Sequence, residues 1–447
     1  MSIIGTVESL WRYPVKSMRR EQLNEVLPPP RRLAGRQGHF AQLDGLRALA
    51  VTSVAWSHWA PGRYSLGLPW GTGVQLFFVL SGFLISGILL DAKAGEPNQS
   101  VSGRFAIWRS FYARRFLRIF PLYYAVLAVT FLLGVSPITH TWKWHVTYLS
   151  NFFYVQQGGW GHMIDPFHHF WSLAVEEQFY LVWPFLILLL TRRTLLKVLI
   201  GMILIAPVFR ITMYWMGVQK EMIHLLPFSC MDSLGIGSLF AYMMRYPIGT
   251  VWQADRVSRL CLLLGLPGCV GFALLERISH GSFVARSIGH FWLVLFYGWI
   301  VCWAATGSKG LAGLFLQSRP IAYVGKISYG LYVFHLFAIL AIPAIASQIG
   351  LGETLAASVP LKVVSNALFT MILAMASWHL FEAPINKLKR YFPYTSKPKV
   401  LDDPQKTFPH VLEVNLNPTT NTQRPCDHQL GESTRYQSPT ANETERV

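Results

Sequence analysis

A succession of long apolar segments constrains the fold of this chain more than any other feature. Each has roughly the 17 to 25 residues that an α-helix needs to cross the hydrocarbon core of a bilayer. Because lipid offers the backbone no hydrogen-bond partner, such segments cross it as helices. We therefore predict an all-α, polytopic membrane bundle of about ten transmembrane helices, centred on residues 44–62, 70–90, 116–135, 170–190, 195–216, 227–244, 258–276, 288–306, 323–346 and 362–382.

Composition and charge support this reading and orient the bundle. Hydrophobic residues make up 52% and charged residues 14% of the 447-residue chain, whereas soluble domains are about 25% charged. In a soluble chain the net charge of +17 would suggest nucleic-acid binding, but here we attribute it to topology and expect no nucleic-acid partner. With ten spans and both termini cytoplasmic, most basic residues lie on the inner side of a cell inner membrane, and Arg210 is among the few assigned to the outer side.

An eleventh apolar segment, residues 142–157, is aromatic but short and polar. A span there would invert every later loop and remove the charge asymmetry, so we interpret it as interfacial or re-entrant. The chain has no CxxC spacing and no His/Cys ligand cluster, and we expect neither a metal site nor structural disulfides.

The two ends of the chain differ from the bundle, which we place at residues 41–390. Residues 1–27 alternate as strands do and resemble the start of a MOSC domain, but they are too few for its barrel, and we assign the segment 1–40 no function. Residues 1–40 lack the apolar region of a cleavable signal peptide, so the first span would serve as an uncleaved signal. Residues 391–447 are rich in Pro, Ser, Thr, Asn and Gln, and we expect a disordered cytoplasmic tail.

The first predicted span carries an arginine and a histidine. Arg47 lies at its cytoplasmic end, next to Asp44, and His58 follows about 16 Å further along at 1.5 Å per residue. An ionisable side chain inside a membrane is energetically expensive and usually functional, and imidazole suits general-base catalysis near neutral pH. The alternative is a packing histidine that is hydrogen-bonded to a neighbouring helix.

Two further pairs of charged residues are candidates for a site. Arg115 and Arg118 are three residues apart and share a helix face, which suits a phosphate clamp or ordinary anchoring at the membrane surface. Glu176 and Glu177 lie about two turns inside an apolar segment and point about 100° apart. A buried carboxylate must be paired or protonated, so one of them either orients a catalytic group or forms a structural ion pair with an arginine.

Weaker candidates come from the remaining segments. We interpret the His- and Trp-rich segment 136–169 as an interfacial surface compatible with sugar stacking. The glycines of the second span favour close helix packing, although Ser81 beside Gly82 would also suit the lining of a passage. For His335 in the membrane and Glu382 at the cytoplasmic end of the last span, structural pairing is favoured over direct catalysis.

Six ordered motifs give these residues a family context: DGLRALAV with His58, FFVLSGFLISGIL, RRFLRIFPLYY, FWSLAVEEQFYLVWP, ISYGLYVFHL and FEAPI. Over residues 40 to about 390 the chain resembles the acyltransferase-3 family of membrane proteins, which includes bacterial O-antigen and exopolysaccharide O-acetylases. The resemblance implies transfer of an acyl group, commonly acetyl, from cytoplasmic acyl-CoA to a hydroxyl of an envelope glycan or other extracytoplasmic acceptor. The family's expected essential residues map onto His58, Arg47, Arg115 and Arg118.

The resemblance leads to a mechanistic hypothesis. Arg115 and Arg118, with Arg47, would hold the phosphates of acyl-CoA, while His58 removes the acceptor proton or carries the acyl group. Glu176 or Glu177 would fix the tautomer of His58. Some family members have a C-terminal SGNH-type domain that this sequence lacks, so the bundle itself or a partner protein would complete the transfer. A transporter or flippase with a buried His/Glu proton relay is the alternative, although no internal repeat supports it.

Overall fold

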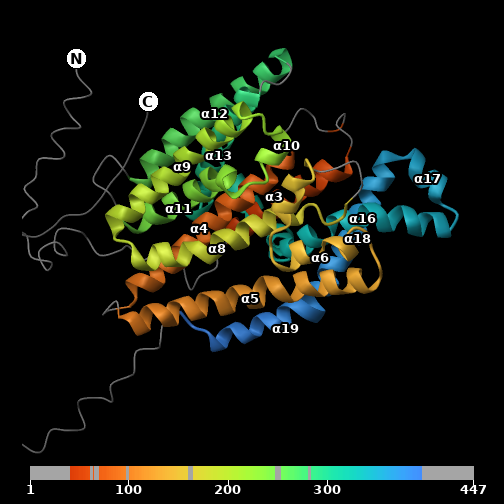
Figure 1. The fold of residues 1–447 in the computed structure, drawn as a ribbon, viewed down its shortest axis with the longest axis horizontal. Helices are drawn as coiled ribbons and strands as arrows, with labels where there is room; N and C mark the ends of the chain where they lie inside the picture. The colour runs from red at the N-terminus through yellow and green to blue at the C-terminus, as the bar shows by residue number, and fades with distance from the viewer. Residues whose placement is uncertain are drawn as a thin grey trace, which may run out of the picture. The chain divides into compact units, whose positions relative to one another are not determined.

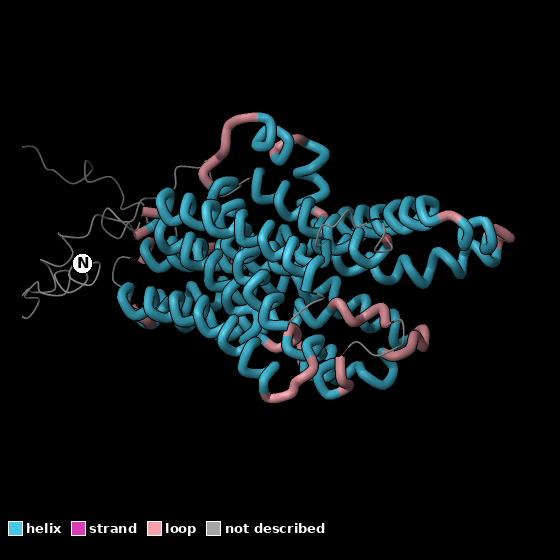
Figure 2. Tube along the Cα trace, turned by 90° about the horizontal axis from the view of Figure 1, so that it is seen from above, coloured by secondary structure: helices cyan, strands magenta, loops and turns pink. Residues whose placement is uncertain are grey.

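In the computed structural model, the described residues are 41–60, 64, 70–96, 100–159, 165–246, 253–279 and 283–394. This part of the chain is helical and contains no strand (Figure 2), which confirms the predicted all-α class. The MOSC-like segment, the rest of residues 1–40 and residues 395–447 lie outside the described residues.

Among the described residues, seven helices are long and apolar enough to cross a membrane by length and composition. The first combines η3 (Trp70–Thr72) and α4 (Gly73–Ala94). The other six involve α5 (Val101–Leu132), α8 (Phe170–Leu189), α9 (Arg192–Trp215), α13 (Phe283–Ala305), α16 (Ser328–Gln348) and α18 (Val359–Ser377). Three other helices coincide with the remaining predicted spans: α3 (Ala41–Trp59), α11 (Met231–Arg245) and α12 (Ala254–Ser279). The chain is thus a multi-pass helical protein, and the count of ten stays a prediction.

Several predicted boundaries were wrong. The span placed at 116–135 is the 32-residue helix α5, which starts at Val101 because the Ser100 side chain caps it by accepting a 3.0 Å hydrogen bond from the Gly103 N–H. Residues 142–157, predicted to be interfacial or re-entrant and not a span, fall in two short helices, α6 (Ile138–Val146) and α7 (Ser150–Gln156). The span placed at 323–346 is interrupted at Ile327, between α15 (Arg319–Lys326) and α16.

The C-terminal end of the bundle is a series of short turns. After α18 come the π-helical turn η5 (Trp378–Glu382), α19 (Ala383–Asn386) and η6 (Lys387–Tyr391). These turns run along α5 (Figure 1). Residues 391–394 belong to this packed part, because the Ser110 hydroxyl donates a 2.8 Å hydrogen bond to the Pro393 carbonyl. Residues 391–394, predicted as the start of the tail, are therefore part of the packed bundle. The other short elements are α10 (Lys220–Ile223), η4 (Pro227–Cys230), α14 (Leu311–Leu316) and α17 (Gly352–Ala357).

Helices α4 and α11 pack closely because glycine removes the side chain at each crossing point. A Cβ atom on Gly82 would lie 2.1 Å from the Leu234 carbonyl oxygen, and one on Gly237 would lie 2.0 Å from the Val79 carbonyl oxygen. Neither distance is sterically allowed, so the approach requires glycine. The packing role predicted for the glycines of the second span is confirmed at Gly82.

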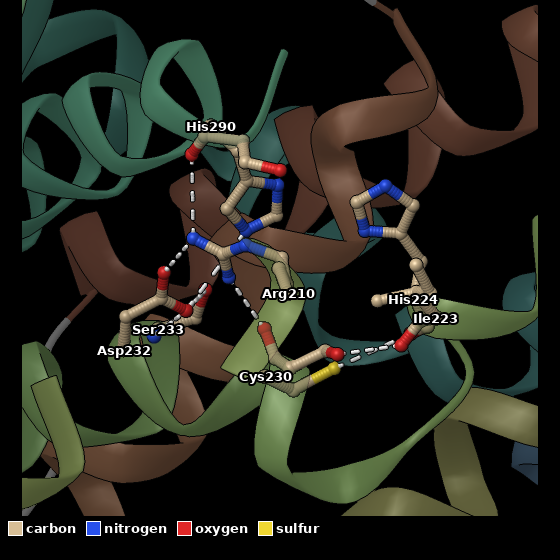
Figure 3. Close-up of polar contacts among 9 residues, drawn as sticks. Arg210, Ile223, His224, Cys230, Asp232, Ser233 and His290 are labelled. Atoms are coloured by element: carbon tan, nitrogen blue, oxygen red, sulfur yellow. Dashed lines mark hydrogen bonds and ion pairs between the residues drawn. The ribbon is translucent and has the colours of Figure 1, made fainter. Parts of the chain in front are cut away.

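A buried ion pair joins α9 to α11. Arg210 and Asp232 are both fully buried, and the Arg210 Nη2 donates to Asp232 Oδ2 over 2.8 Å (Figure 3). Arg210 Nη1 also donates to the Ser229 carbonyl over 2.6 Å, and His290 from α13 lies 3.9 Å from Asp232 Oδ1. The charge of Arg210 is therefore neutralised inside the bundle, and its assignment to the outer side of the membrane stays a prediction.

Replacing Gly237 with leucine is expected to destabilise the protein, because the new side chain would force α4 and α11 apart. Overpacking of this kind costs about 1–3 kcal/mol or more. Gly201→Leu is the matched control, since Gly201 is exposed on α9 and has no atom within 4 Å of its Cβ position. Thermal unfolding of the purified variants in detergent measures the difference, and equal melting temperatures would contradict the packing argument.

Removing the Asp232 carboxylate is expected to cost about 3–5 kcal/mol, because Asp232→Ala leaves the Arg210 charge buried without its partner. The Arg245–Asp91 pair offers a control, since Asp91 is 54% exposed and lies 2.6 Å from Arg245. Asp91→Ala should cost less than Asp232→Ala, because solvent reaches the Asp91 side of this pair, although Arg245 itself is 8% exposed. The same unfolding measurement tests both variants, and a neutral Asp232→Ala would show that the buried pair does not stabilise the bundle.

Candidate functional site

A cavity with six cationic side chains lies among α3, α4, α5 and the C-terminal turns. We call it the basic cavity, and its lining is Leu43, Asp44, Arg47, Leu84, Ile88, Arg114, Arg115, Arg118, Lys326, Trp378, Lys389 and Tyr394. Asp44 is the only acidic group in this lining, and it pairs with Arg47 over 2.9 Å. The cavity therefore carries a large excess of positive charge and suits a ligand with several negative charges.

The two arginines of the RxxR pair face this cavity together, as their spacing on α5 predicts. Neither guanidinium makes a hydrogen bond or ion pair with another residue of the described part of the chain. Each instead lies against aromatic rings: Arg115 is 5.4 Å from the Tyr180 ring centroid, and Arg118 is 5.8 Å from that of Trp378. These contacts position the two charges and leave their donors available to phosphate oxygens.

A second cavity continues from the first. Arg47, Arg115 and Arg118 line both, and the further lining of this middle cavity is Val74, Phe77, Phe78, Ser81, Ile119, Ser172, Leu173, Glu176, Tyr180, Ser328, Tyr329 and Tyr332. Glu176 accepts a 2.6 Å hydrogen bond from the Ser81 hydroxyl. The structure thus brings two predicted candidates together on the wall of a passage.

A third cavity, which we call the histidine cavity, adjoins the middle one and shares Val74 and Tyr332 with it. Its lining is Val54, Ser57, His58, Gly71, Val74, His168, His169, Trp171 and Tyr332. His58 reaches it from α3, the same helix that presents Arg47 to the basic cavity. The three cavities form a series that begins at arginine side chains and ends at imidazoles.

The hydrogen bonds of His58 define its tautomer. Its Nδ1 lies 2.9 Å from the Val54 carbonyl oxygen, which can only accept, so Nδ1 carries the proton and Nε2 has the lone pair. The prediction that Glu176 or Glu177 fixes this tautomer was wrong. Glu176 is bonded to Ser81, and Glu177 Oε1 is buried without a hydrogen-bond partner in the described structure, because adjacent helix positions face different neighbours.

Other imidazoles surround His58. The ring centroids of His335 and His168 lie 5.1 and 5.5 Å from that of His58, and His169 lies 4.8 Å from His335. His335 is fully buried, its Nδ1 donates to the Tyr332 carbonyl over 2.6 Å, and its Nε2 has no hydrogen-bond partner in the described part. His335 is therefore close to the predicted catalytic histidine.

His168 and His169 are site residues that the sequence indicated only weakly. Their segment is predicted as an interfacial surface, whereas both side chains line the internal histidine cavity and His169 is 2% exposed. Burial lowers the pKa of His168, so its ring is neutral at pH 7. Their only sequence signal is their position directly before the helix that carries Glu176. His145 of the same segment is fully buried against Phe170 and is not a surface residue.

The remaining candidates divide between the site and its surroundings. Asp44 and Ser81 line cavities, whereas Glu177 and Glu382 line none of the three. Glu382 accepts a 2.9 Å hydrogen bond from Ser377 within the last turns of the bundle. It fits the structural role that the sequence favoured.

Fold and site together define a class: a multi-pass helical membrane protein with an internal series of cavities between a cationic and an imidazole end. The chain belongs to the acyltransferase-3 family, whose acyltransferase domain matches residues 40–379. This membership favours an enzyme over the transporter alternative.

Curated relatives carry names that agree with this family. Peptidoglycan O-acetyltransferase OatA of Listeria monocytogenes is 27% identical over 410 residues, which cover 80% of this chain and 60% of that protein. O-acetyltransferase OatA of Staphylococcus aureus is 26% identical, with 81% and 58% covered. A putative peptidoglycan O-acetyltransferase of Bacillus subtilis, YrhL, is 28% identical, with 77% and 54% covered. The chain thus spans about 60% or less of the length of these relatives. No solved structure matches the chain.

Proposed function

We propose that this protein is a membrane O-acyltransferase that moves an acetyl group from cytoplasmic acyl-CoA to a hydroxyl of an envelope glycan such as peptidoglycan. One observation carries the proposal: arginines without ion-pair partners in the described structure and a histidine with an available lone pair lie at opposite ends of adjoining cavities. The names of the relatives support the acetyl group and the glycan acceptor.

The donor would enter at the basic cavity, which this proposal places on the cytoplasmic side of an inner membrane. Arg115 and Arg118 would bind the phosphates as charge-assisted hydrogen-bond donors, and the thioester arm would extend through the middle cavity. Arg47 and His58 are eleven residues apart on α3, or about 16 Å at 1.5 Å per residue. An extended pantetheine arm is of comparable length, so the thioester can reach the imidazole.

His58 Nε2 would begin the chemistry at the other end. As a base, it accepts the proton of the acceptor hydroxyl while the hydroxyl oxygen attacks the thioester carbonyl and the thiolate leaves. As a nucleophile, it takes the acyl group first and passes it to the hydroxyl in a second step. A labelled acyl-enzyme that is absent from His58→Ala identifies the second route. A partner protein would be needed where the final acceptor lies beyond the reach of the bundle.

Two substitutions test the proposed activity. His58→Ala removes the base, and Arg118→Ala removes a hydrogen-bond donor to the phosphates of acyl-CoA. We therefore expect each substitution to lower acetyl transfer by about a hundredfold or more. His140→Ala and Arg109→Ala are matched controls, because both residues are exposed and line none of the three cavities. The measurement is mass spectrometry of glycan oligomers incubated with acetyl-CoA and purified protein in liposomes. Full activity in both site variants would exclude the proposed site.

The adjacent glutamates provide a sharper comparison. Glu176 lines the passage and Glu177 does not, so we expect Glu176→Gln to reduce acetyl transfer by about tenfold, the effect of 1.4 kcal/mol on a barrier. Glu177→Gln makes the same chemical change one residue away and should retain the wild-type rate. Equal rates in the two variants of the same assay would show that the carboxylate in the passage has no part in transfer.

A further inference from the structure

We propose that Lys326 and Lys389 form a second phosphate site in the basic cavity, which binds the 3′-phosphate of coenzyme A. This inference rests on the acyl-CoA donor proposed above and extends it to a recognition site that the RxxR motif does not include. The ligand chemistry is a phosphomonoester on a ribose, separated from a pyrophosphate.

The linings of the cavities place the cationic side chains in an order. Arg47, Arg115 and Arg118 line both the basic and the middle cavity, whereas Lys326 and Lys389 line the basic cavity alone. The lysines therefore lie beyond the arginines as seen from His58. In coenzyme A the thiol, the pantetheine arm, the pyrophosphate and the 3′-phosphate follow one another in the same order. A donor with its thioester toward His58 thus places its pyrophosphate at the arginines and its 3′-phosphate at the lysines.

Lys389 is held at this position by contacts of the main chain around it. Arg114 Nη1 donates to the carbonyl oxygens of Lys389 and Phe392, over 3.0 and 3.1 Å. The Ser110 hydroxyl donates to the Pro393 carbonyl over 2.8 Å. These bonds attach the end of the bundle to α5. They fix the backbone of Lys389 while its ammonium group makes no hydrogen bond or ion pair with any described residue.

Lys326 lines the basic cavity from α15. Its Nζ lies 5.0 Å from the ring centroid of Trp378, which also contacts Arg118. The second aromatic residue of the lining, Tyr394, lies 5.1 Å from the Arg114 guanidinium. Aromatic rings next to cations are the kind of surface on which a nucleotide base stacks, so the basic cavity suits the adenosine 3′-phosphate part of the donor.

The matched control for Lys389 lies two residues away. Lys387 belongs to the same turn, η6, but is exposed and lines none of the three cavities, whereas Lys389 is half-buried in the basic cavity. Lys387→Gln and Lys389→Gln therefore remove the same charge from the same turn, and only the second removes it from the proposed site.

The experiment is calorimetric titration of the full-length protein in detergent with coenzyme A and with 3′-dephospho-coenzyme A. We expect Lys389→Gln and Lys326→Gln each to raise the Kd for coenzyme A by about tenfold, the effect of losing one charge-assisted hydrogen bond. The Kd for 3′-dephospho-coenzyme A should stay at the wild-type value in both variants, and Lys387→Gln should change neither.

Comparing the two ligands distinguishes a failure of the proposed 3′-phosphate site from a failure of the proposed acyl-CoA donor. A lysine variant that weakens both ligands equally, or neither, overturns the 3′-phosphate site and leaves the acyl-CoA donor intact. Wild-type protein that binds neither ligand overturns the donor and this inference with it. Selective loss of coenzyme A binding supports both.

Discussion

The cost of placing charge inside an apolar bundle determines where the polar side chains of this protein lie. Most buried charges have a partner: Arg210 binds Asp232, and Arg245 binds Asp91. Lys93 donates to the Ile187 and Leu190 carbonyl oxygens at the end of α8. Such pairing offsets the loss of hydration. Arg115 and Arg118 depart from this pattern, because they face cavities and have no ion-pair partner among the described residues. In the proposed function, these two guanidinium groups therefore bind the phosphates of the donor.

The location of the long helices was predictable from the length of the apolar segments. The ends of the helices, which depend on local contacts, were less predictable. Hydropathy located the helices, but the first half of α5 contains Arg104, Arg109 and Arg114, which hide it from an apolar window. The Ser100 cap nevertheless starts a helix there. The interruption at Ile327 has no glycine or proline at the break to mark it. Both errors arise because hydrophobicity measures burial in lipid, whereas helix ends depend on hydrogen bonds.

Some residues of the candidate site can be recognised within a single helix, whereas others depend on how several helices pack together. His58 and the RxxR pair could be predicted as candidates because a polar residue in an apolar helix stands out in the sequence. His168 and His169 lie just before α8 and reach the cavity only because α16 packs near them, as the bond between His169 and the Val333 carbonyl shows. The tautomer prediction failed for a related reason. Sequence alone does not give the rotation of α8 relative to α3, and α8 directs Glu176 toward Ser81.

Helix α3 connects the charge argument to the chemistry, because it contributes to every cavity in the series. It presents Asp44 and Arg47 to the basic cavity, and Val54, Ser57 and His58 to the histidine cavity. A continuous helix holds its two ends at a fixed separation, so neither Arg47 nor His58 can move to meet the other. In the proposed reaction, an acyl group whose donor binds at the arginines must therefore arrive on a flexible arm long enough to span the helix. A donor that combines several phosphates with a long, uncharged arm satisfies both the cationic cavity and the distance, and a short acyl phosphate would satisfy only the first.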